Sequence, residues 1–320
     1  MDAIKMIGEV GLVPVVVIEN SDDAIFAGEA LMSAGIKVME ITMRTEAGIR
    51  AIENIRKGLP DMLVGAGTIL TIEKCKEAVD AGAQFIVAPG FNPLIVEWCL
   101  ENTIDVTPGC VTPTEIEKAL SYGLNTLKFF PASVYGGVEG CKALYGPYKS
   151  ADVKFIPTGG IGNGNLSEYA DKPFVHAIGG GWLCKSADID AHNFEAITEN
   201  AKKAVDLLLG FKVSHVGINQ ESEAKSLSVA ETFNEAFRFS VKQGNSSNFA
   251  GNDIEITKSK YYGEFGHLAV QTNSIPRAAY YLSQRGFELD METAKYKGNK
   301  LVAVYLKDEF GGFAVHLLQK

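Results

Sequence analysis

The chain contains a short apolar segment with one lysine inside it, Thr126-Leu127-Lys128-Phe129-Phe130-Pro131-Ala132. This pattern predicts a buried β-strand that ends at the proline, because proline cannot donate to the hydrogen-bond ladder of a sheet. Side chains alternate along a strand, so Thr126, Lys128 and Phe130 are expected on one face. Burial among apolar neighbours favours the neutral form of a lysine, and a neutral amine is a nucleophile. The alternative is a lysine whose amine reaches solvent at the strand end.

Seven further strand candidates flank this segment at intervals of roughly 20 to 28 residues, the length of one strand–helix unit. Amphipathic stretches such as Ser21–Ala34 and Pro93–Glu101 lie between them. Eight parallel strands, each followed by a helix, close into a (β/α)8 TIM barrel, and this α/β fold is our prediction for residues 1–210. A doubly wound open sheet is the alternative, although no glycine-rich dinucleotide fingerprint follows the first strand. The eight candidates are Leu12–Ile18, Lys37–Met43, Met62–Thr68, Phe85–Pro89, Ile104–Pro108, Thr126–Pro131, Lys154–Thr158 and Val175–Ile178.

The composition is typical of a globular protein, with 320 residues, 46% hydrophobic residues and a net charge of −9. The acidic balance and the lack of a basic block argue against nucleic-acid binding. The first residues do not begin a signal peptide, and no apolar run reaches membrane-spanning length. Five scattered cysteines lack metal or redox spacing and are expected to stay reduced. We therefore expect a cytoplasmic protein without membrane contacts.

The second strand candidate places two charged residues on its inner face. Glu40 and Arg44 alternate with Met39, Ile41 and Met43, whose side chains suit packing against outer helices. An unpaired charge inside a barrel is costly. One interpretation is a structural salt bridge between Glu40 and Arg44. The other is that Glu40 transfers protons while the planar guanidinium of Arg44 holds a substrate carboxylate.

Several strand ends are rich in small residues. In a barrel of this kind, the C-terminal ends of the strands and the loops that follow them carry the function. The segments Gly65–Thr68 and Val87–Gly90 leave room for a ligand. Two glycine loops, Pro157–Ile161 and Gly179–Trp182, follow the seventh and eighth strand candidates. This is the recurrent phosphate position of the fold, since glycine lets backbone N–H groups approach an anion closely.

Taken in order, the motifs resemble those of the 2-keto-3-deoxy-6-phosphogluconate and 4-hydroxy-2-oxoglutarate aldolases over about residues 5–206. The resemblance implies a class I aldolase of carbohydrate metabolism, of the Entner–Doudoroff type. Such an enzyme is a metal-independent barrel, usually a homotrimer, that cleaves a small 2-keto acid. The motifs are Glu40-Ile41-Thr42-Met43-Arg44-Thr45, Gly65-Ala66-Gly67-Thr68, Lys128-Phe129-Phe130-Pro131-Ala132, Pro157-Thr158-Gly159-Gly160-Ile161 and Gly179-Gly180-Gly181-Trp182.

The same resemblance implies a role for each matching residue. Lys128 corresponds to the lysine that forms a Schiff base with the substrate, and Glu40 corresponds to the general acid/base. Many family members carry serine where this chain has Gly181, so a hydroxyl donor is missing near the phosphate-binding end. The residues implied to line the pyruvate pocket are Arg44, Thr68, Pro89 and Phe130. Those implied toward the phosphate-binding end are Thr158, Gly159, Gly160, Gly180 and Gly181.

Two other functions stay open at this point. A barrel that binds a phosphorylated ligand as a sensor would need the glycine loops, but it would have no use for Lys128 beside Glu40. A phosphosugar isomerase or epimerase would use paired acid/base groups and would form no imine.

A different pattern begins after Gly210 and occurs twice. Each copy predicts a strand, a helix and further strands, so residues 211–320 are predicted to form a smaller α+β domain of two βαβββ-type modules. This domain resembles the glyoxalase and extradiol-dioxygenase (vicinal oxygen chelate) domains. The predicted elements are His215–Ile218, the helix Glu221–Phe237, strands around Phe237–Val241 and Asp253–Thr257, then His267–Val270, the helix Ile275–Arg285, and strands near Leu301–Leu306 and Phe313–Leu317.

Four candidate metal ligands occupy equivalent positions in the two modules. His215 and His267 open the first strands, whereas Glu255 and His316 lie in the final strands. In the resembled family these positions hold a divalent metal ion, although a glutamate is more common where His316 stands. Imidazole and carboxylate ligands together suit zinc, iron, nickel or manganese. The alternative is a domain that has kept its fold without a metal and packs subunits or binds an effector.

Overall fold

The computed structural model describes residues 2–320, which divide into two compact units. The first unit ends at Leu208 and the second spans Leu209–Lys320. The helix α10 (Phe194–Leu209) leads from one to the other. Within the described residues, no helix combines the length and the hydrophobicity that a bilayer span requires.

The N-terminal unit contains eight parallel strands. Six of them form one sheet in the order β5-β4-β3-β2-β1-β8, and β6 pairs with β7. Isolated bridges from Gly109 to Lys128 and from Thr158 to Gly179 join this pair to both edges of the larger sheet. The parallel, barrel-like α/β arrangement predicted from the strand spacing is therefore confirmed. The strands are β1 (Leu12–Val16), β2 (Val38–Thr42), β3 (Leu63–Gly67), β4 (Phe85–Val87), β5 (Asp105–Thr107), β6 (Thr126–Phe129), β7 (Lys154–Pro157) and β8 (Ile178–Gly180).

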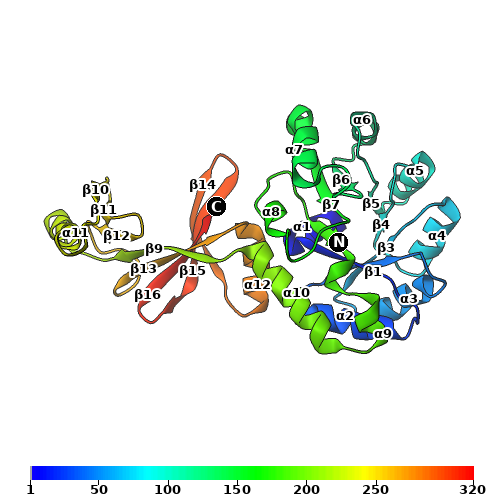
Figure 1. Cartoon of the computed structure of the whole chain (residues 1–320), viewed down its shortest axis with the longest axis horizontal. Helices are drawn as coiled ribbons and strands as arrows, with labels where there is room; N and C mark the ends of the chain where they lie inside the picture. The colour runs from blue at the N-terminus through cyan, green and yellow to red at the C-terminus, as the bar shows by residue number, and fades with distance from the viewer. Residues whose placement is uncertain (1) are drawn as a thin grey trace. The chain divides into compact units, whose positions relative to one another are not determined.

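Helices lie around the outside of these strands (Figure 1). Each buries a small apolar face, as α3 does with Ala51, Ile52 and Ile55. The N-termini are fixed by side chains where the sequence offers them, for example by the Thr112–Glu115 capping box of α6. The helices of this unit before α10 are α1 (Ala3–Val10), α2 (Asp23–Ser33), α3 (Gly48–Gly58), α4 (Ile72–Asp80), α5 (Pro93–Glu101), α6 (Pro113–Ser121), α7 (Gly137–Tyr148), α8 (Ser167–Ala170) and α9 (Ser186–Asp190).

One end of the strand ring is covered by α1. The Ala3 N–H donates to Asp105 Oδ2 at 2.9 Å, which ties this helix to the start of β5. Ile7 is fully buried and reaches the interior between the strands. Because α1 covers the ends at which the strands begin, access to the interior is expected from the opposite end, where the strands finish.

The eighth strand begins later than the sequence predicts. We expected Val175–Ile178, whereas β8 is Ile178–Gly180, so two glycines assigned to a loop are part of the strand. The reason is the close approach of neighbouring strands: a Cβ at Gly179 would lie 2.4 Å from Thr158 Oγ1. Only glycine fits there, and the strand therefore lacks the apolar side chains by which strands are recognised.

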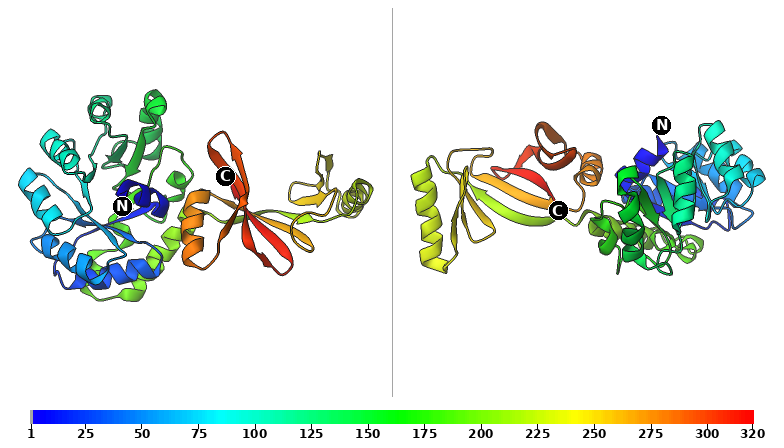
Figure 2. Two further views of the ribbon diagram at one scale, coloured as in Figure 1. Left: turned by 180° about the vertical axis from the view of Figure 1, so that it is seen from behind. Right: turned by 90° about the horizontal axis from the view of Figure 1, so that it is seen from above.

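The C-terminal unit is built on one sheet of eight strands in the order β10-β11-β12-β9-β13-β16-β15-β14. Its elements follow the order β-α-β-β-β twice, and the two helices α11 and α12 lie at opposite ends of this unit (Figure 2). The first and last strands of each half are central in the sheet. The elements are β9 (Lys212–Ile218), α11 (Glu223–Phe237), β10 (Val241–Gln243), β11 (Ser247–Ala250), β12 (Ile254–Thr257), β13 (Gly266–Thr272), α12 (Ile275–Gln284), β14 (Leu289–Lys297), β15 (Lys300–Phe310) and β16 (Phe313–Gln319).

Three details of the C-terminal unit differ from the prediction. The strand expected around Phe237–Val241 is shorter, since α11 continues to Phe237, Arg238 adopts a left-handed φ of 62°, and β10 starts at Val241. The strands β11 and β14 were not predicted. Most of β14 is solvent-exposed and polar, so it lacks the apolar alternation by which a strand is recognised.

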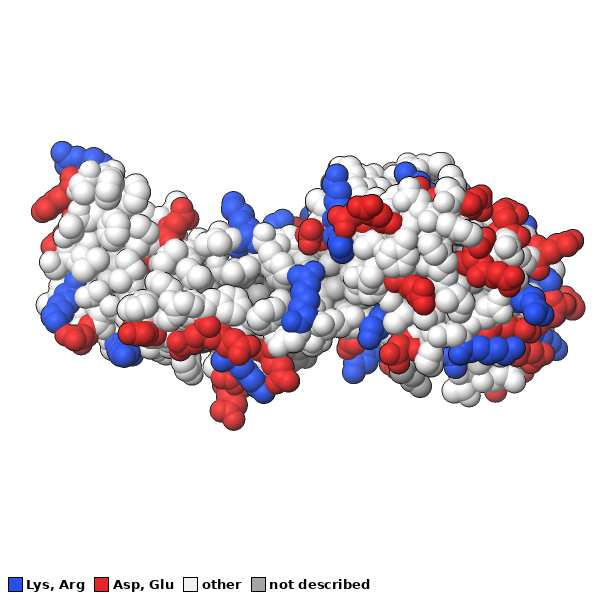
Figure 3. Space-filling model, turned by 90° about the horizontal axis from the view of Figure 1, so that it is seen from below, with Lys and Arg blue, Asp and Glu red and all other residues white. Residues whose placement is uncertain are grey.

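Charged side chains are distributed in mixed fashion over the face drawn in Figure 3. Lysine and arginine alternate there with aspartate and glutamate, without a continuous basic tract.

Candidate active site

A buried ion pair lies inside the strand ring of the N-terminal unit. Lys128 Nζ, from β6, is 3.2 Å from Glu40 Oε1, from β2. The two side chains are only 7% and 3% exposed. The ammonium also lies 5.4 Å from the centre of the Phe130 ring. The predicted burial of Lys128 is therefore confirmed, and the alternative, an amine that reaches solvent, is excluded because the lysine finds a carboxylate partner within the ring.

The neighbouring strand β3 makes room for Glu40. In the register of β2 and β3, Glu40 pairs with Gly65 and Thr42 with Gly67. A Cβ at Gly67 would lie 2.0 Å from Glu40 Oε1, which no side chain could tolerate. The glycines of this segment therefore serve the position of the carboxylate directly. The sequence indicated only that these glycines leave room for a ligand, whereas the structure shows that Gly67 makes room for Glu40.

A small cavity of about 10 Å³ adjoins the pair. Glu40, Lys128 and Thr158 all line it, so the structure brings these three predicted residues together. A cavity of this size holds about one water molecule. Such a water could carry a proton between Glu40 and a ligand.

The sequence analysis missed two buried hydroxyl groups near the pair. Thr107, at the end of β5, is 1% exposed and lines the same cavity. Thr42 is fully buried, and its hydroxyl has no hydrogen-bond partner among the described residues. Both lie at the C-terminal ends of strands, which is the signal that could have identified them.

The residues expected around a pyruvate unit follow the ends of four strands. Since parallel strands end at a common edge, these positions share one rim. Arg44 lies in the turn after β2 and is exposed, and no ion pair joins it to Glu40 in the part of the chain that the structure describes. Thr68, Pro89 and Phe130 are half-buried. Thr68 has a φ of 58°, which is strained for a β-branched residue and is typical of functional sites.

The two glycine loops lie on the same rim, after β7 and at the end of β8. Gly159 and Gly160 have φ values of 92° and 74°, which L side chains rarely adopt. Gly180 packs against Trp182, whose ring a Cβ would meet at 2.1 Å. Gly181 is exposed, and a Cβ there would meet only Val15 O at 3.4 Å. Gly181 is thus the one member of this group where a side chain fits without displacement.

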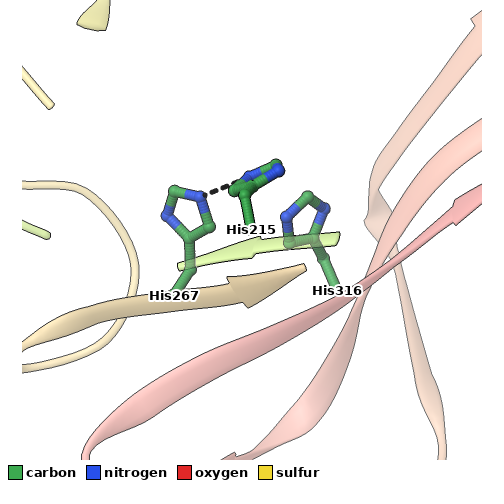
Figure 4. A group of neighbouring side chains, drawn as sticks. All are labelled: His215, His267 and His316. Atoms are coloured by element: carbon green, nitrogen blue, oxygen red, sulfur yellow. Dashed lines mark hydrogen bonds between the residues drawn. The ribbon is translucent and has the colours of Figure 1, made fainter. Parts of the chain in front are cut away.

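A second polar cluster lies in the C-terminal unit. His215 of β9, His267 of β13 and His316 of β16 point toward one another from neighbouring strands (Figure 4). Their nearest ring nitrogens all lie within 4.8 Å of one another. Glu255 of β12 joins them, with its Oε2 at 3.1 Å from His215 Nε2 and at 3.4 Å from His267 Nε2. All four residues predicted from the module pattern are therefore brought together.

The electrostatics of this cluster favour a carboxylate on Glu255 and a neutral imidazole on His316. Hydrogen bonds from His215 and His267 lower the pKa of Glu255 below its usual range. Burial, with the charges of the neighbouring histidines, lowers the pKa of His316 to about 3. His316 Nε2 is buried and has no hydrogen-bond partner among the described residues. A neutral imidazole with a free lone pair is the form in which histidine binds a metal ion.

Comparisons with known proteins concern the N-terminal unit. The family model "KDPG and KHG aldolase" matches residues 4–200. A 2-dehydro-3-deoxy-phosphogluconate aldolase of Treponema pallidum (strain Nichols) is 43% identical over 199 residues, which are 62% of this chain and 94% of that protein. A KHG/KDPG aldolase of Escherichia coli (strain K12) is 38% identical over 195 residues, which are 61% of this chain and 91% of that protein.

A solved structure gives the same result. The KDPG aldolase of Legionella pneumophila, crystallised with pyruvate captured as a covalent carbinolamine intermediate, is 36% identical. The similarity has a TM-score of 0.61 and covers 64% of this chain and 98% of that one.

The contact between Gly67 and Glu40 gives a first prediction. Gly67→Ala is expected to displace Glu40 and to lower the free energy of unfolding by about 1–3 kcal/mol, as overpacking does. The control Gly146→Ala adds a methyl where nothing lies within 4 Å and is expected to be neutral or stabilising. Thermal unfolding and a crystal structure of each variant check this. An unmoved Glu40 in a Gly67→Ala protein of unchanged stability would contradict it.

Proposed function

The chain belongs to the KDPG and KHG aldolase family, and from this premise we propose that it is a class I aldolase. It cleaves 2-keto-3-deoxy-6-phosphogluconate to pyruvate and glyceraldehyde 3-phosphate, and 4-hydroxy-2-oxoglutarate to pyruvate and glyoxylate. The observation that carries this proposal is the buried contact of 3.2 Å between Lys128 Nζ and Glu40 Oε1. A ligand sensor would have no use for this pair.

The first step requires an unprotonated lysine. Transfer of a proton from Lys128 to Glu40 leaves a neutral amine, which adds to the ketone carbon of the substrate. Protonated Glu40 gives its proton to the carbinolamine hydroxyl, which leaves as water, so an iminium forms and Glu40 is a carboxylate again. The positive nitrogen serves as the electron sink for the next step, so this reaction needs no metal ion.

The second step breaks a carbon–carbon bond. A base removes the proton of the hydroxyl group beyond that bond, the aldehyde leaves, and the bonding electrons form an enamine with the iminium carbon. An acid then protonates the enamine carbon, and hydrolysis releases pyruvate from Lys128. Glu40 is positioned to act twice, first as base and then as acid, through a water in the adjoining cavity. Each such proton transfer contributes about 10²–10⁴-fold.

The rim residues orient the substrate in this proposal. The guanidinium of Arg44 holds the carboxylate of the 2-keto acid, and Thr68, Pro89 and Phe130 surround the pyruvate unit. The exposure of Arg44 suits a side chain that meets its partner only when substrate arrives. The distal end of the substrate lies against the second group of residues, where backbone N–H groups are accessible to a phosphate. That group is Thr158, Gly159, Gly160, Gly180 and Gly181.

We extend the proposal to the finer architecture and the surroundings of the protein. Residues 1–210 form a (β/α)8 TIM barrel and residues 211–320 a glyoxalase-like domain of two βαβββ modules. The bridges that link β6 and β7 to both edges of the larger sheet support ring closure. A homotrimer follows from the resemblance alone. The five cysteines are free and buried, which supports a reducing, cytoplasmic location.

Reduction with borohydride in the presence of pyruvate tests the mechanism. We expect a pyruvyl adduct on Lys128, identified by peptide mass analysis. Lys128→Arg should lower cleavage by more than about 10³-fold, since a guanidinium cannot form the imine. Lys154→Arg, on the neighbouring strand β7, should retain activity. An adduct on another lysine, or none, would overturn the role of Lys128, and retained turnover in Lys128→Arg would favour an isomerase that forms no imine.

The space at Gly181 gives a prediction on substrate preference. We expect activity on both acids, with the phosphorylated one preferred. Gly181→Ser should lower its KM by about two- to tenfold, the value of one added hydrogen bond, and should change that of 4-hydroxy-2-oxoglutarate less. Gly146→Ser is the control. Equal effects on both substrates would mean that Gly181 does not face the phosphate.

We propose a divalent metal site as a second function, located in the C-terminal unit. Its ligands are His215, Glu255, His267 and His316. The distance from His215 Nε2 to His267 Nε2 is 3.2 Å, and Glu255 Oε2 lies 3.1 and 3.4 Å from these two atoms. Ligands at about 2.1 Å from one zinc ion are separated by about 3.0–3.4 Å, so these three atoms already fit an ion. When bound, the ion would supply Lewis-acid chemistry.

Elemental analysis of protein purified without a histidine tag checks the metal site. We expect near-stoichiometric metal in the natural chain and substoichiometric metal in Glu255→Gln, which keeps the size of the side chain. His192→Ala, at a surface histidine paired with Asp23, should retain the metal. Aldol cleavage should survive a chelator, because Lys128 needs no metal. Equal metal content in all variants would end the proposal.

A further inference from the structure

The four proposed metal ligands lie in the wall of a much larger cavity. This cavity has a volume of about 290 Å³, near the lower end of small-molecule sites. The remaining wall residues are mostly hydroxyl-bearing, and a single lysine, Lys295 of β14, is among them. They are Ser246, Ser247, Thr257, Ser259, Tyr261, Lys295 and Tyr305. A cavity of this size and polarity suits a ligand of a few carbon atoms with several oxygen atoms.

The charges around the cavity are unbalanced. Among the described residues that line it, Glu255 is the only carboxylate and Lys295 the only lysine or arginine. A divalent ion and Lys295 would together carry three positive charges against the single negative charge of Glu255. Lys295 is solvent-exposed, whereas the four proposed ligands are buried or half-buried, so it is the uncompensated charge of a bound ion that favours an anionic ligand over a neutral one.

The placement of Lys295 sets the length of that ligand. In the sheet, Lys295 pairs with Ala303 of β15, and β15 also pairs Tyr305 with His316 of β16. Lys295 and His316 are thus on strands two apart and two residues out of register, so their Cα atoms are about 12 Å from each other. Lys295, His215, His267 and His316 all line the same cavity, so the ammonium and the histidines face one ligand space. An acid of three to five carbons would reach from the ammonium to the cluster.

The aromatic part of the wall suits the carbon atoms of such a ligand. Tyr305 is stacked on His316 at a centroid distance of 4.8 Å and is 8% exposed. Tyr261 lies across from it at 6.3 Å and is 46% exposed. These rings offer apolar surface beside the polar cluster, whereas an inorganic anion would make no use of it.

We propose that this cavity binds a small 2-oxo carboxylate, with its carboxylate held by Lys295 and its carbonyl oxygen directed to the metal cluster. The inference rests on the proposed metal site. The proposed aldol cleavage supports the choice of acid, since it releases molecules of this class, pyruvate and glyoxylate. The same chain would then carry a second site for its own product class.

The test uses the full chain with Lys128→Met, so that pyruvate cannot form an imine in the barrel, loaded with Co²⁺. The visible absorption of Co²⁺ reports only on ligands at the ion. Pyruvate is expected to produce a saturable change in this spectrum. Lys295→Gln should weaken pyruvate binding about tenfold, the value of a charge-assisted hydrogen bond, with an unchanged cobalt content. Lys297→Gln, exposed on the same strand and absent from the cavity wall, should bind as the parent does.

Each other outcome separates the two proposals. A protein that retains no Co²⁺ overturns the metal site and this inference with it. A cobalt-loaded protein whose spectrum does not respond to pyruvate overturns the inference alone. So does a Lys295→Gln variant with undiminished affinity, or binding of the neutral hydroxyacetone or of inorganic phosphate as tightly as pyruvate.

Discussion

The contact between Lys128 and Glu40 constrains everything around it in the N-terminal unit. Two charges inside a ring of apolar strands are tolerated only if each satisfies the other, and removal of either would leave a buried charge without compensation. Lys128 on β6 and Glu40 on β2 can pair only if these two strands face each other across a ring of strands. In a flat sheet, two strands that are not neighbours would be too far apart for their side chains to meet. Gly67 then allows the carboxylate to stand where it does. The ion pair that the proposed chemistry uses therefore depends on this arrangement of the strands.

The sequence predicted the barrel well because its strands are short apolar runs at a regular spacing, and every helix between them has a buried stripe. The prediction failed where a strand has glycines in place of apolar side chains, and where a contact joins residues that are far apart in the sequence. The start of β8 was misplaced because Gly179 and Gly180 have no apolar side chain. Thr107 was missed because its place at the end of a strand was the only local signal, and that place alone does not show that its hydroxyl lines the same cavity as Lys128. Arg44 was expected to point inward, but it lies in the turn after β2 and is exposed.

In the C-terminal unit, too, some functional residues could be predicted from the sequence and others could not. Its four candidate ligands could be predicted because each occupies a defined place in a repeated order of elements, and the repeat brings first and last strands together at the centre of the sheet. Lys295 could not be predicted. It lies on β14, an exposed polar strand without hydrophobic alternation, which only its pairing with β15 reveals. The cavity and the lysine in its wall could therefore be identified only from the structure.

The two proposed sites would supply positive charge to a ligand in different ways. In the mechanism that we propose, Glu40 takes the proton of Lys128, and the positive charge that activates the substrate is created afterwards, as an iminium on the substrate itself. In the C-terminal cavity, the described wall provides one carboxylate, Glu255, so in our proposal a bound metal ion and Lys295 supply the positive charge before any ligand binds. A 2-oxo acid presents the same carbonyl and carboxylate to both. A chain that handles such acids could therefore activate them covalently at one site and electrostatically at the other, with no shared residue and no shared cofactor.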